Sequence, residues 1–341
     1  MKIINKISKE ISYQTGVYTL PPEFVSIIIT MNCNFRCESC HIWENQNVEE
    51  LNESEWKNIA NKLSSELKPD TFIEINGGEA LIKKNIVITL AKELKKNFKK
   101  IALNSNGSLF NDENLDELKN AGIDLIKISF YSLNKSTHDN LRGHPSAYDN
   151  VMRSIELINK KGINLEIGIL ITSKNIKEIP ELIKYLQKLP NTSIVLQALD
   201  EKIESIESKN KQENKIITNL WPNENDSDEF FKWVFQNNKN IKNSIPNIKA
   251  IHEYYMNPDN IIKYRCFAGQ RNIVIYPNGD LSLCFKRDKI GNINKQELKD
   301  ILINAKSERK NIKYCKKYCR IVGCNFSRGI KEFIKDEILK N

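Results

Sequence analysis

The stretch that decides the fold is FVSIIITMNCNFRCESC, residues 24–40. Its first half, residues 24–31, is apolar and rich in β-branched side chains, which is typical of a strand buried on both faces of a parallel sheet. Its second half carries three thiols, Cys33, Cys37 and Cys40, in the spacing C-x3-C-x2-C. The sequence therefore predicts a buried strand that leads directly into a cysteine loop.

Three thiols on one short loop predict a metal centre. A tetrahedral zinc site normally takes four ligands, whereas a four-iron, four-sulfur cube on three thiolates leaves one iron open to a substrate or cofactor. His41 follows Cys40 and is a candidate fourth zinc ligand, but C-x2-C-H is not a usual zinc spacing. The pattern favours an iron–sulfur cluster, with a zinc knuckle as the alternative.

Strand-like and helix-like segments alternate along residues 24–199. Asn52 and Glu55 have the spacing of a capping box, and a helical apolar stripe begins at Trp56. Further strands are expected at 71–75, 100–104, 124–130, 164–171 and 193–199, with helices at 86–98, 114–120 and 148–160 and one capped by Asn175 and Glu178. Six strands that alternate with helices predict an α/β fold with a parallel sheet or barrel.

The chain divides into three expected parts: an N-terminal extension (1–22), the barrel (23–240) and a small cysteine-rich α+β domain (241–341). Residues 200–225 are rich in Lys, Glu, Asn and Ser, which indicates an exposed linker or lid. A helix is expected around Phe230. Segments 271–276 and 281–285 flank the turn Pro277-Asn278-Gly279-Asp280, which predicts a hairpin.

Polar and glycine residues follow three of the expected strands. Gly77-Gly78-Glu79 comes after the second strand, Asn104 ends the third and Ser129 lies near the end of the fourth. The carboxyl ends of parallel barrel strands meet at one mouth, where active sites gather. Two glycines let a ligand approach the backbone closely, and a carboxylate can pair with an ammonium group.

At these motifs the sequence resembles the radical S-adenosylmethionine (radical SAM) superfamily. The resemblance rests on the C-x3-C-x2-C loop and on the GGE motif one βα unit later. It implies a partial (β/α)6 TIM-type barrel and a [4Fe–4S] cluster on Cys33, Cys37 and Cys40 that binds S-adenosylmethionine. An electron from that cluster would cleave S-adenosylmethionine reductively to a 5′-deoxyadenosyl radical.

The resemblance also implies a set of cofactor-binding residues: Phe35, Gly77, Gly78, Glu79, Asn104, Ser129 and Arg142. Glu79 would hold the methionine amino group, Asn104 and Ser129 would contact the ribose and carboxylate, and Arg142, which precedes Gly143, would bind a carboxylate.

The sequence departs from the family pattern at three places. Ser39 stands where relatives carry an aromatic residue, and the nearby substitutes are Phe35, His41 and Trp43. Ala80 replaces the usual proline after GGE. Phe130-Tyr131-Ser132 stands where many relatives have an apolar residue, Asp and Gly.

The five remaining cysteines lie in the last quarter of the chain: Cys266, Cys284, Cys315, Cys319 and Cys324. With Gly279 before Cys284, they resemble the SPASM/Twitch extension of radical SAM enzymes, which holds auxiliary clusters. Two clusters bound entirely by thiolates would need about eight cysteines, so one auxiliary [4Fe–4S] cluster is expected. Which four thiols bind it stays open, and a zinc ribbon is the alternative.

Composition excludes several classes of protein. The 341 residues are 40% hydrophobic, and the net charge of +9 is spread along the chain, not gathered in a basic stripe, so nucleic acid is not indicated as a partner. No signal peptide and no apolar run of about 18 residues is present, so membrane association is not expected. A cytoplasmic location is expected, where eight cysteines stay reduced and available for metal.

The sequence thus predicts a radical SAM oxidoreductase that abstracts hydrogen from a small polar metabolite or sugar, with the auxiliary cluster taking part in electron transfer. The resemblance implies a flavodoxin- or ferredoxin-type electron donor, and the residues identify no catalytic side chain. Alternatives are a maturase of a ribosomally made peptide, a non-catalytic Fe–S electron carrier and a zinc-stabilised binding protein.

Overall fold

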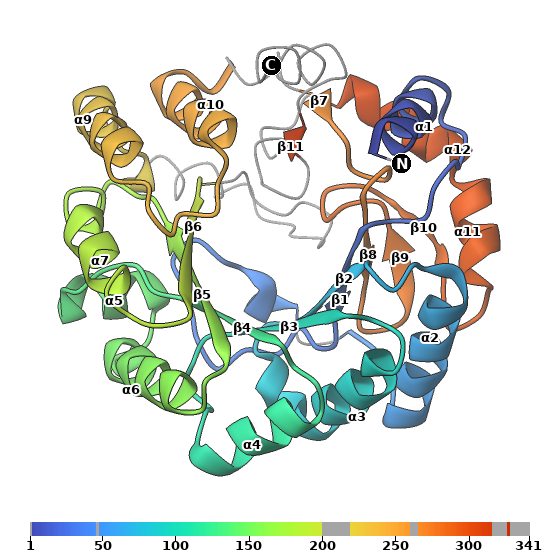
Figure 1. Ribbon diagram of the computed structural model, residues 1–341, viewed down its shortest axis with the longest axis horizontal. Helices are drawn as coiled ribbons and strands as arrows, with labels where there is room; N and C mark the ends of the chain where they lie inside the picture. Colours follow the sequence, from blue (N-terminus) through green and yellow to red (C-terminus); the bar gives the residue numbers. More distant parts are fainter. Residues whose placement is uncertain (1, 46–47, 200–218, 260–264, 316–325, 328–341) are drawn as a thin grey trace.

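The computed structural model describes residues 2–45, 48–199, 219–259, 265–315 and 326–327. Parallel strands form the inner wall of a partial barrel, and helices surround it (Figure 1). The strands β1 (Phe24–Ile28), β2 (Phe72–Asn76), β3 (Lys100–Ser105), β4 (Leu125–Ser129), β5 (Asn164–Leu170) and β6 (Thr192–Gln197) pair in chain order. The predicted partial (β/α)6 barrel is confirmed.

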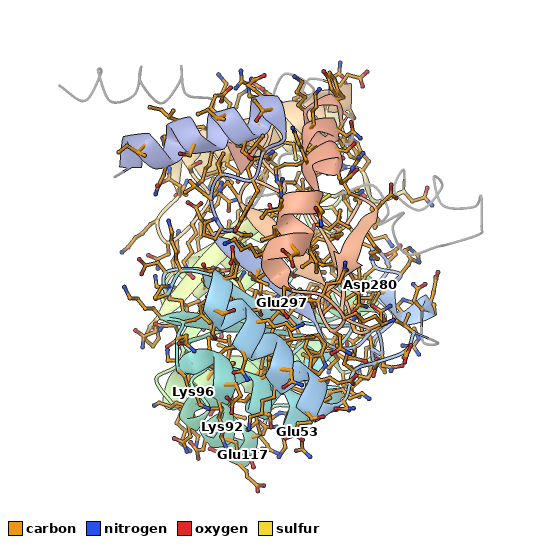
Figure 2. All side chains as sticks on the ribbon, turned by 90° about the vertical axis from the view of Figure 1, so that its right-hand side faces the viewer. Glu53, Lys92, Lys96, Glu117, Asp280 and Glu297 are labelled. Atoms are coloured by element: carbon orange, nitrogen blue, oxygen red, sulfur yellow. The ribbon has the colours of Figure 1, made fainter. Side chains whose placement is uncertain are left out.

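The outer helices are α2 (Glu53–Glu66), α3 (Lys84–Lys95), α4 (Asp112–Asn120), α6 (Ala147–Lys160) and α7 (Ile179–Leu186). Helix α2 begins with the predicted capping box, because Asn52 and Glu55 bond each other's backbone N–H reciprocally. Its buried face carries Trp56, Ile59 and Leu63, and each such side chain stabilises the packing by roughly 1.5–3 kcal/mol. Charged side chains cover the outer faces, as Glu53, Lys92 and Glu117 show in Figure 2.

Two local predictions need correction. Helix α5 (Lys135–Arg142), between β4 and α6, was not expected from the sequence. The capping box predicted at Asn175 is wrong: the Asn175 carboxamide oxygen accepts bonds from the backbone N–H and hydroxyl of Thr172, both at 2.8 Å, so it tightens a loop. Helix α7 starts later, at Ile179, and Glu178 contacts Ser132 and Thr137 instead.

Helices α9 (Glu224–Gln236) and α10 (Ile245–Met256) follow β6 and cover the open side of the barrel (Figure 1). The helix expected around Phe230 is therefore present. The Tyr255 hydroxyl of α10 donates to the carbonyl of Ile171 at 2.6 Å and accepts from the N–H of Leu199 at 2.8 Å, which joins α10 to the barrel. Most of the segment predicted as a linker or lid, residues 200–218, lies outside the described residues.

The predicted hairpin forms, and it continues the barrel sheet. Strands β8 (Asn272–Ile275) and β9 (Asp280–Ser282) flank a turn in which Gly279 has φ +83°, a conformation that glycine adopts without strain. Strand β8 pairs in parallel with β1, and β10 (Lys289–Asn292) pairs with β9, which gives the order β10-β9-β8-β1-β2-β3-β4-β5-β6. The small C-terminal region is thus built onto the first barrel strand.

The remaining elements of the C-terminal region are β7 (Arg265–Cys266) paired with β11 (Phe326–Ser327), α11 (Leu298–Asn304), α12 (Lys306–Asn311) and the 3-10 turn η4 (Ile312–Tyr314). Two further short 3-10 turns belong to the barrel: η1 (Ile42–Glu44) follows the cysteine loop, and η2 (Ala80–Lys83) lies between β2 and α3. The N-terminal extension forms α1 (Lys2–Thr15), which packs on α12. No helix within the described ranges has the length and apolar character needed to span a bilayer.

The fully buried Arg309 of α12 joins the N-terminal extension to the C-terminal region. Its guanidinium donates to the carbonyls of Gly16, Gly269 and Leu302 at 2.8, 3.1 and 2.6 Å. Burial lowers the pKa of Arg309 to about 10, so the side chain stays charged at neutral pH.

Candidate iron–sulfur and S-adenosylmethionine site

A cavity of about 310 Å³ opens at the carboxyl ends of the barrel strands. Cys33, Cys37 and Cys40 all line it, together with six of the seven predicted cofactor-binding residues: Phe35, Gly77, Gly78, Asn104, Ser129 and Arg142. Residues from the cysteine loop, β2, β3, β4 and α5 thus meet at one mouth, as expected for strands that run in parallel.

The cysteine loop is held in place by contacts that require glycine. A Cβ on Gly78 would lie 2.3 Å from the carbonyl oxygen of Asn32, and a Cβ on Gly143 would lie 1.9 Å from that of Arg36. The Glu79 N–H donates to the Asn32 carbonyl at 2.8 Å, and the Glu38 N–H donates to the Leu141 carbonyl at 3.1 Å. The glycines of GGE and of Arg142-Gly143 therefore allow β2 and α5 to pack directly against the loop backbone.

The thiols fit iron–sulfur ligation. The backbone N–H of Phe35 lies 3.4 Å from the Cys33 sulfur, and the N–H of Ile42 bonds the Cys40 sulfur, so each sulfur accepts an amide bond from two residues further along the chain. Burial raises the pKa of Cys33, and it raises that of Cys40 to about 11. Iron must therefore displace protons from these thiols as it binds.

Within the described residues, no three His, Cys, Asp or Glu side chains converge as a single metal ion would require. A four-iron cube places each thiolate on a different iron, so its ligands stand farther apart than those of one ion. His41, the candidate fourth zinc ligand, does not line the cavity that the three thiols share, and its Nδ1 atom lies 2.8 Å from the Glu44 carboxylate.

Arg142 is buried and its charge acts on all three thiols. One terminal nitrogen donates to the Tyr131 hydroxyl at 3.1 Å, and the guanidinium carbon lies 5.6 Å from the centre of the Phe35 ring. Its Nε atom is buried without a hydrogen-bond partner among the described residues, and the same is true of Asn104 Oδ1. Both residues line the cavity, and each thus has one buried polar atom that the described residues leave unsatisfied.

The Glu79 carboxylate is placed differently from the other predicted residues. It is fully buried, and it accepts bonds from the N–H of Leu81 at 3.0 Å, the hydroxyl of Ser105 at 3.0 Å and the N–H of Asn106 at 2.6 Å. Burial raises the pKa of Glu79, while these three bonds and the charge of Arg142 oppose that rise. The carboxylate fastens the ends of β2 and β3 to each other, and its predicted contact with a methionine amino group stays a prediction.

The aromatic side chains near Ser39 divide into two groups. Phe35 and Trp43 line the cavity, and the Trp43 indole N–H donates to the Cys40 carbonyl at 2.8 Å. His41 turns to Glu44 instead. Of the three substitutes that the sequence offered for the missing aromatic residue, two are placed to contact a ligand.

A charged network inside the barrel was missed in the sequence. The Lys127 ammonium of β4 lies 2.5 Å from the Glu74 carboxylate of β2 and 3.0 Å from the Glu166 carboxylate of β5. Burial alone would lower the pKa of Lys127, but the two carboxylates outweigh it and raise that pKa. Asn104 donates to Glu74 at 3.0 Å, which links this network to the cavity.

A signal for this network was present. The segments FIEIN, LIKIS and NLEIGIL alternate between apolar and polar residues, whereas strands buried between two apolar layers are apolar throughout. The alternation indicates that one face of these strands is polar. In this barrel that face is the interior, which TIM barrels usually fill with Val, Ile and Leu.

The C-terminal thiols form a second group. Cys266 in β7 and Cys284 after β9 are buried, and the charges of Cys266 and Cys315 both act on Cys284. Burial raises the pKa of Cys284 to about 12, against the effect of an N–H bond from Lys286 to its sulfur. Cys319 and Cys324 lie outside the described residues.

Comparison with known proteins now decides the family. Residues 27–186 match the model of the radical SAM superfamily, and residues 266–325 match the model of an iron–sulfur cluster-binding domain, SPASM. The chain carries a radical SAM domain and a SPASM domain. Its cofactors are accordingly [4Fe–4S] clusters and S-adenosylmethionine, as the sequence predicted, and the matched ranges contain all eight cysteines.

Individual relatives are distant. An AdoMet-dependent heme synthase from Methanosarcina barkeri (strain Fusaro / DSM 804) is 27% identical over 173 residues, which are 50% of this chain and 49% of that protein. The chain thus matches about half the length of this curated relative. Its radical SAM membership carries no specific reaction, because curated relatives include a heme synthase, probable GTP 3′,8-cyclases and a bacteriocin biosynthesis protein.

Two solved structures share the fold. Streptococcus suis SuiB bound to its precursor peptide SuiA has a TM-score of 0.64 at 16% identity, over 85% of this chain and 66% of that one. Native anSMEcpe with bound AdoMet and the Cp18Cys peptide has a TM-score of 0.62 at 17% identity, over 94% of this chain and 98% of that one. At these identities the likeness shows the fold alone.

Proposed function

We propose that this chain is a radical SAM oxidoreductase that abstracts hydrogen from a polar substrate group inside the barrel, with one auxiliary [4Fe–4S] cluster taking part in electron transfer. The observation that carries the proposal is the single cavity that Cys33, Cys37 and Cys40 share with Asn104 and Arg142. When bound there, the cluster supplies the electron that cleaves S-adenosylmethionine reductively.

The residues of the chain would bind and orient the cofactor. The buried Arg142 places a positive charge beside the thiols, and a cation there suits the carboxylate of the methionine moiety. Asn104 and Ser129 line the cavity with a carboxamide and a hydroxyl, which suit a ribose hydroxyl or an ammonium group. Phe35 and Trp43 supply apolar ring surface for the adenine.

The polar interior supports a polar substrate group. The cavity of the three thiols is also lined by Lys127, Glu166 and Gln197, in addition to the residues proposed for the cofactor. An apolar substrate group would displace water from these side chains without replacing its hydrogen bonds. Lys127 and Glu166 would keep their ion pair, but each polar group left unpaired costs about 1–3 kcal/mol. A hydroxyl-bearing or amide-bearing group would replace the water that they lose, which favours the sugar or metabolite that the sequence suggested.

A peptide substrate is the second candidate. Its support is that solved neighbours of this fold, SuiB and anSMEcpe, were determined with peptides bound. A peptide would present one side chain or backbone segment to the cavity, and the polar interior would then select a polar residue at that position. If short peptides copurify with the chain and sugars do not, and if the enzyme abstracts hydrogen from those peptides, the peptide candidate is favoured.

The carrier and zinc alternatives are less well supported. An electron carrier or a zinc-stabilised binding protein has no need of a polar cavity beside its metal-binding thiols, whereas here the three thiols share one with Asn104, Ser129 and Arg142. We also propose that the enzyme works in the reducing cytoplasm, because its thiols must remain free to bind iron. Its electron donor would be a flavodoxin- or ferredoxin-type protein.

The test separates the two cysteine groups. Anaerobic reconstitution of the full chain should give about eight irons, the content of two four-iron clusters, and little zinc. A triple C33A/C37A/C40A variant should keep about half of that iron and lose dithionite-driven formation of 5′-deoxyadenosine. A C266A/C284A variant should also keep about half of the iron, yet still form 5′-deoxyadenosine.

Three outcomes would contradict the proposal. Stoichiometric zinc without iron would exclude both clusters. Full iron loading in the C266A/C284A variant would show that these two cysteines do not bind the auxiliary cluster. Formation of 5′-deoxyadenosine by the triple variant would show that the cavity thiols do not hold the reactive centre.

A further inference from the structure

An ion pair of low exposure joins the two C-terminal segments that carry Cys284 and Cys315. Arg287 lies in the turn after Cys284, and Glu308 lies in α12, which leads through η4 into Cys315. The guanidinium binds the carboxylate through two bonds, from Nε to Oε1 and from a terminal nitrogen to Oε2 at 2.7 Å. Only 24% of the Arg287 side chain and 15% of the Glu308 side chain are exposed.

Arg287 lies close to Cys284. Its backbone N–H donates to the Cys284 carbonyl at 3.4 Å, which closes the turn that carries the guanidinium. Its partner Glu308 belongs to α12, which is followed directly by η4 and Cys315, so the ion pair connects the two segments that carry these thiols. In agreement with this placement, the charge of Arg287 opposes the effect of burial on the pKa of Cys284.

We propose that the Arg287–Glu308 pair sets the reduction potential of the auxiliary cluster. This inference rests on the proposed function, in which Cys284 ligates that cluster. One-electron reduction adds a negative charge to a four-iron cluster, and a fixed cation nearby stabilises the reduced form more than the oxidised form. Glu308 offsets part of this effect, and the low exposure of the pair limits screening by salt.

An electrostatic role and a purely structural role make different predictions. If the pair only ties the Cys284 turn to α12, removal of either partner should loosen the cluster in the same way. If its charges act on the cluster, removal of Arg287 should lower the potential and removal of Glu308 should raise it. The sign of the two shifts therefore decides between the roles.

The experiment is an anaerobic redox titration of the full chain with dithionite and mediators, followed by electron paramagnetic resonance. S-Adenosylmethionine is added in a parallel titration, because it alters the signal of the cluster on Cys33, Cys37 and Cys40 and so distinguishes the two clusters. We expect a lower auxiliary-cluster potential in R287Q, a higher one in E308Q, and a value near the wild type in R287K and in the double variant R287Q/E308Q.

The matched control is K84Q. It breaks the Lys84–Glu117 pair of α3 and α4, whose nitrogen–oxygen distance is also 2.7 Å. Glu117 lies well away from Asp280 of the hairpin strand β9 (Figure 2). It should leave both potentials unchanged. If R287Q fails to load its auxiliary cluster, E308Q and R287K still carry the test, because both retain a positive charge at position 287.

Shifts of the same sign in R287Q and E308Q, or fully loaded variants with unshifted potentials, would overturn the inference. Failure of the proposed function looks different, since the wild-type chain would then show no second cluster to titrate.

Discussion

Replacement of Glu79 by glutamine tests how the GGE motif works in this chain. The carboxylate is fully buried and accepts from two backbone N–H groups, those of Leu81 and Asn106, and from the Ser105 hydroxyl. Glutamine keeps the shape but has only one acceptor oxygen. If that oxygen faces Asn106, the amide nitrogen faces the Leu81 N–H, so two donors meet and neither is satisfied.

The magnitude follows from these bonds. A buried donor left without an acceptor costs about 1–3 kcal/mol, and bonds to a charged acceptor contribute about 1.5–3 kcal/mol. We therefore expect E79Q to lower the free energy of unfolding by about 3 kcal/mol. The affinity for S-adenosylmethionine should fall less than about tenfold, which corresponds to about 1.4 kcal/mol, because the carboxylate acts through Ser105 and Asn106.

Urea unfolding monitored by circular dichroism measures the first effect, and calorimetric titration with S-adenosylmethionine measures the second. S105A is the matched control, since it removes one bond to Glu79 and leaves the Leu81 and Asn106 N–H groups bonded to the carboxylate. It also removes the acceptor of the Gly107 N–H, so it should cost about 1–3 kcal/mol. Unchanged unfolding in E79Q with an affinity loss of about 1–3 kcal/mol would refute the reasoning, because the carboxylate would then contact the methionine ammonium group directly.

Two further predictions concern buried charges. K127M should destabilise the fold by about 3–5 kcal/mol, because it leaves the Glu74 and Glu166 carboxylates without their shared cation. Adding the substitution E74Q to K127M should restore part of this stability, measured in the same urea assay. Burial and the nearby charge of Arg142 lower the pKa of His138 from 6.5 to about 3. The neutral ring therefore contributes stability that is complete above pH 6.5 and is lost as the pH falls toward 3, by roughly 1.4 kcal/mol per pH unit. H138N keeps an acceptor for the Tyr131 N–H and should unfold with a shallower pH dependence over that range; equal slopes in both proteins would contradict this assignment.

The order of strands could be predicted because local patterns and tertiary packing agree in the barrel. The run at residues 24–31 and the capping box at Asn52 each specify the element that forms. The prediction at Asn175 failed because a side chain with the spacing of a capping residue finds closer partners in its own loop, at Thr172. Short-range spacing cannot distinguish these two outcomes, since both satisfy the same carboxamide oxygen.

The cysteines and glycines of the site could also be predicted, because their chemistry allows few substitutes. The direction of the Glu79 side chain could not, since a carboxylate after two glycines can turn toward a ligand or toward the backbone with equal ease. The contacts that decide the matter come from Ser105 and Asn106, in the next strand and the loop after it. The Lys127 network depends likewise on strands that meet only in the folded barrel.

The pairing of β8 with β1 links the two cysteine groups through one rigid sheet. Strand β1 leads into the loop of Cys33, and β8 leads through β9 to Cys284, so the two groups are anchored on neighbouring strands. Contacts on both sides reinforce this arrangement: the Leu51 N–H donates to the Pro277 carbonyl at 2.8 Å, and Lys62 of α2 donates to the Ile293 carbonyl at 3.1 Å. A separation set by a hydrogen-bonded sheet varies little with time, whereas one set by a linker would fluctuate. An electron that passes between the two centres would therefore cross a fixed gap. A variant that alters this electron transfer without changing either cluster's potential would have to act on the residues that lie between the two cysteine groups.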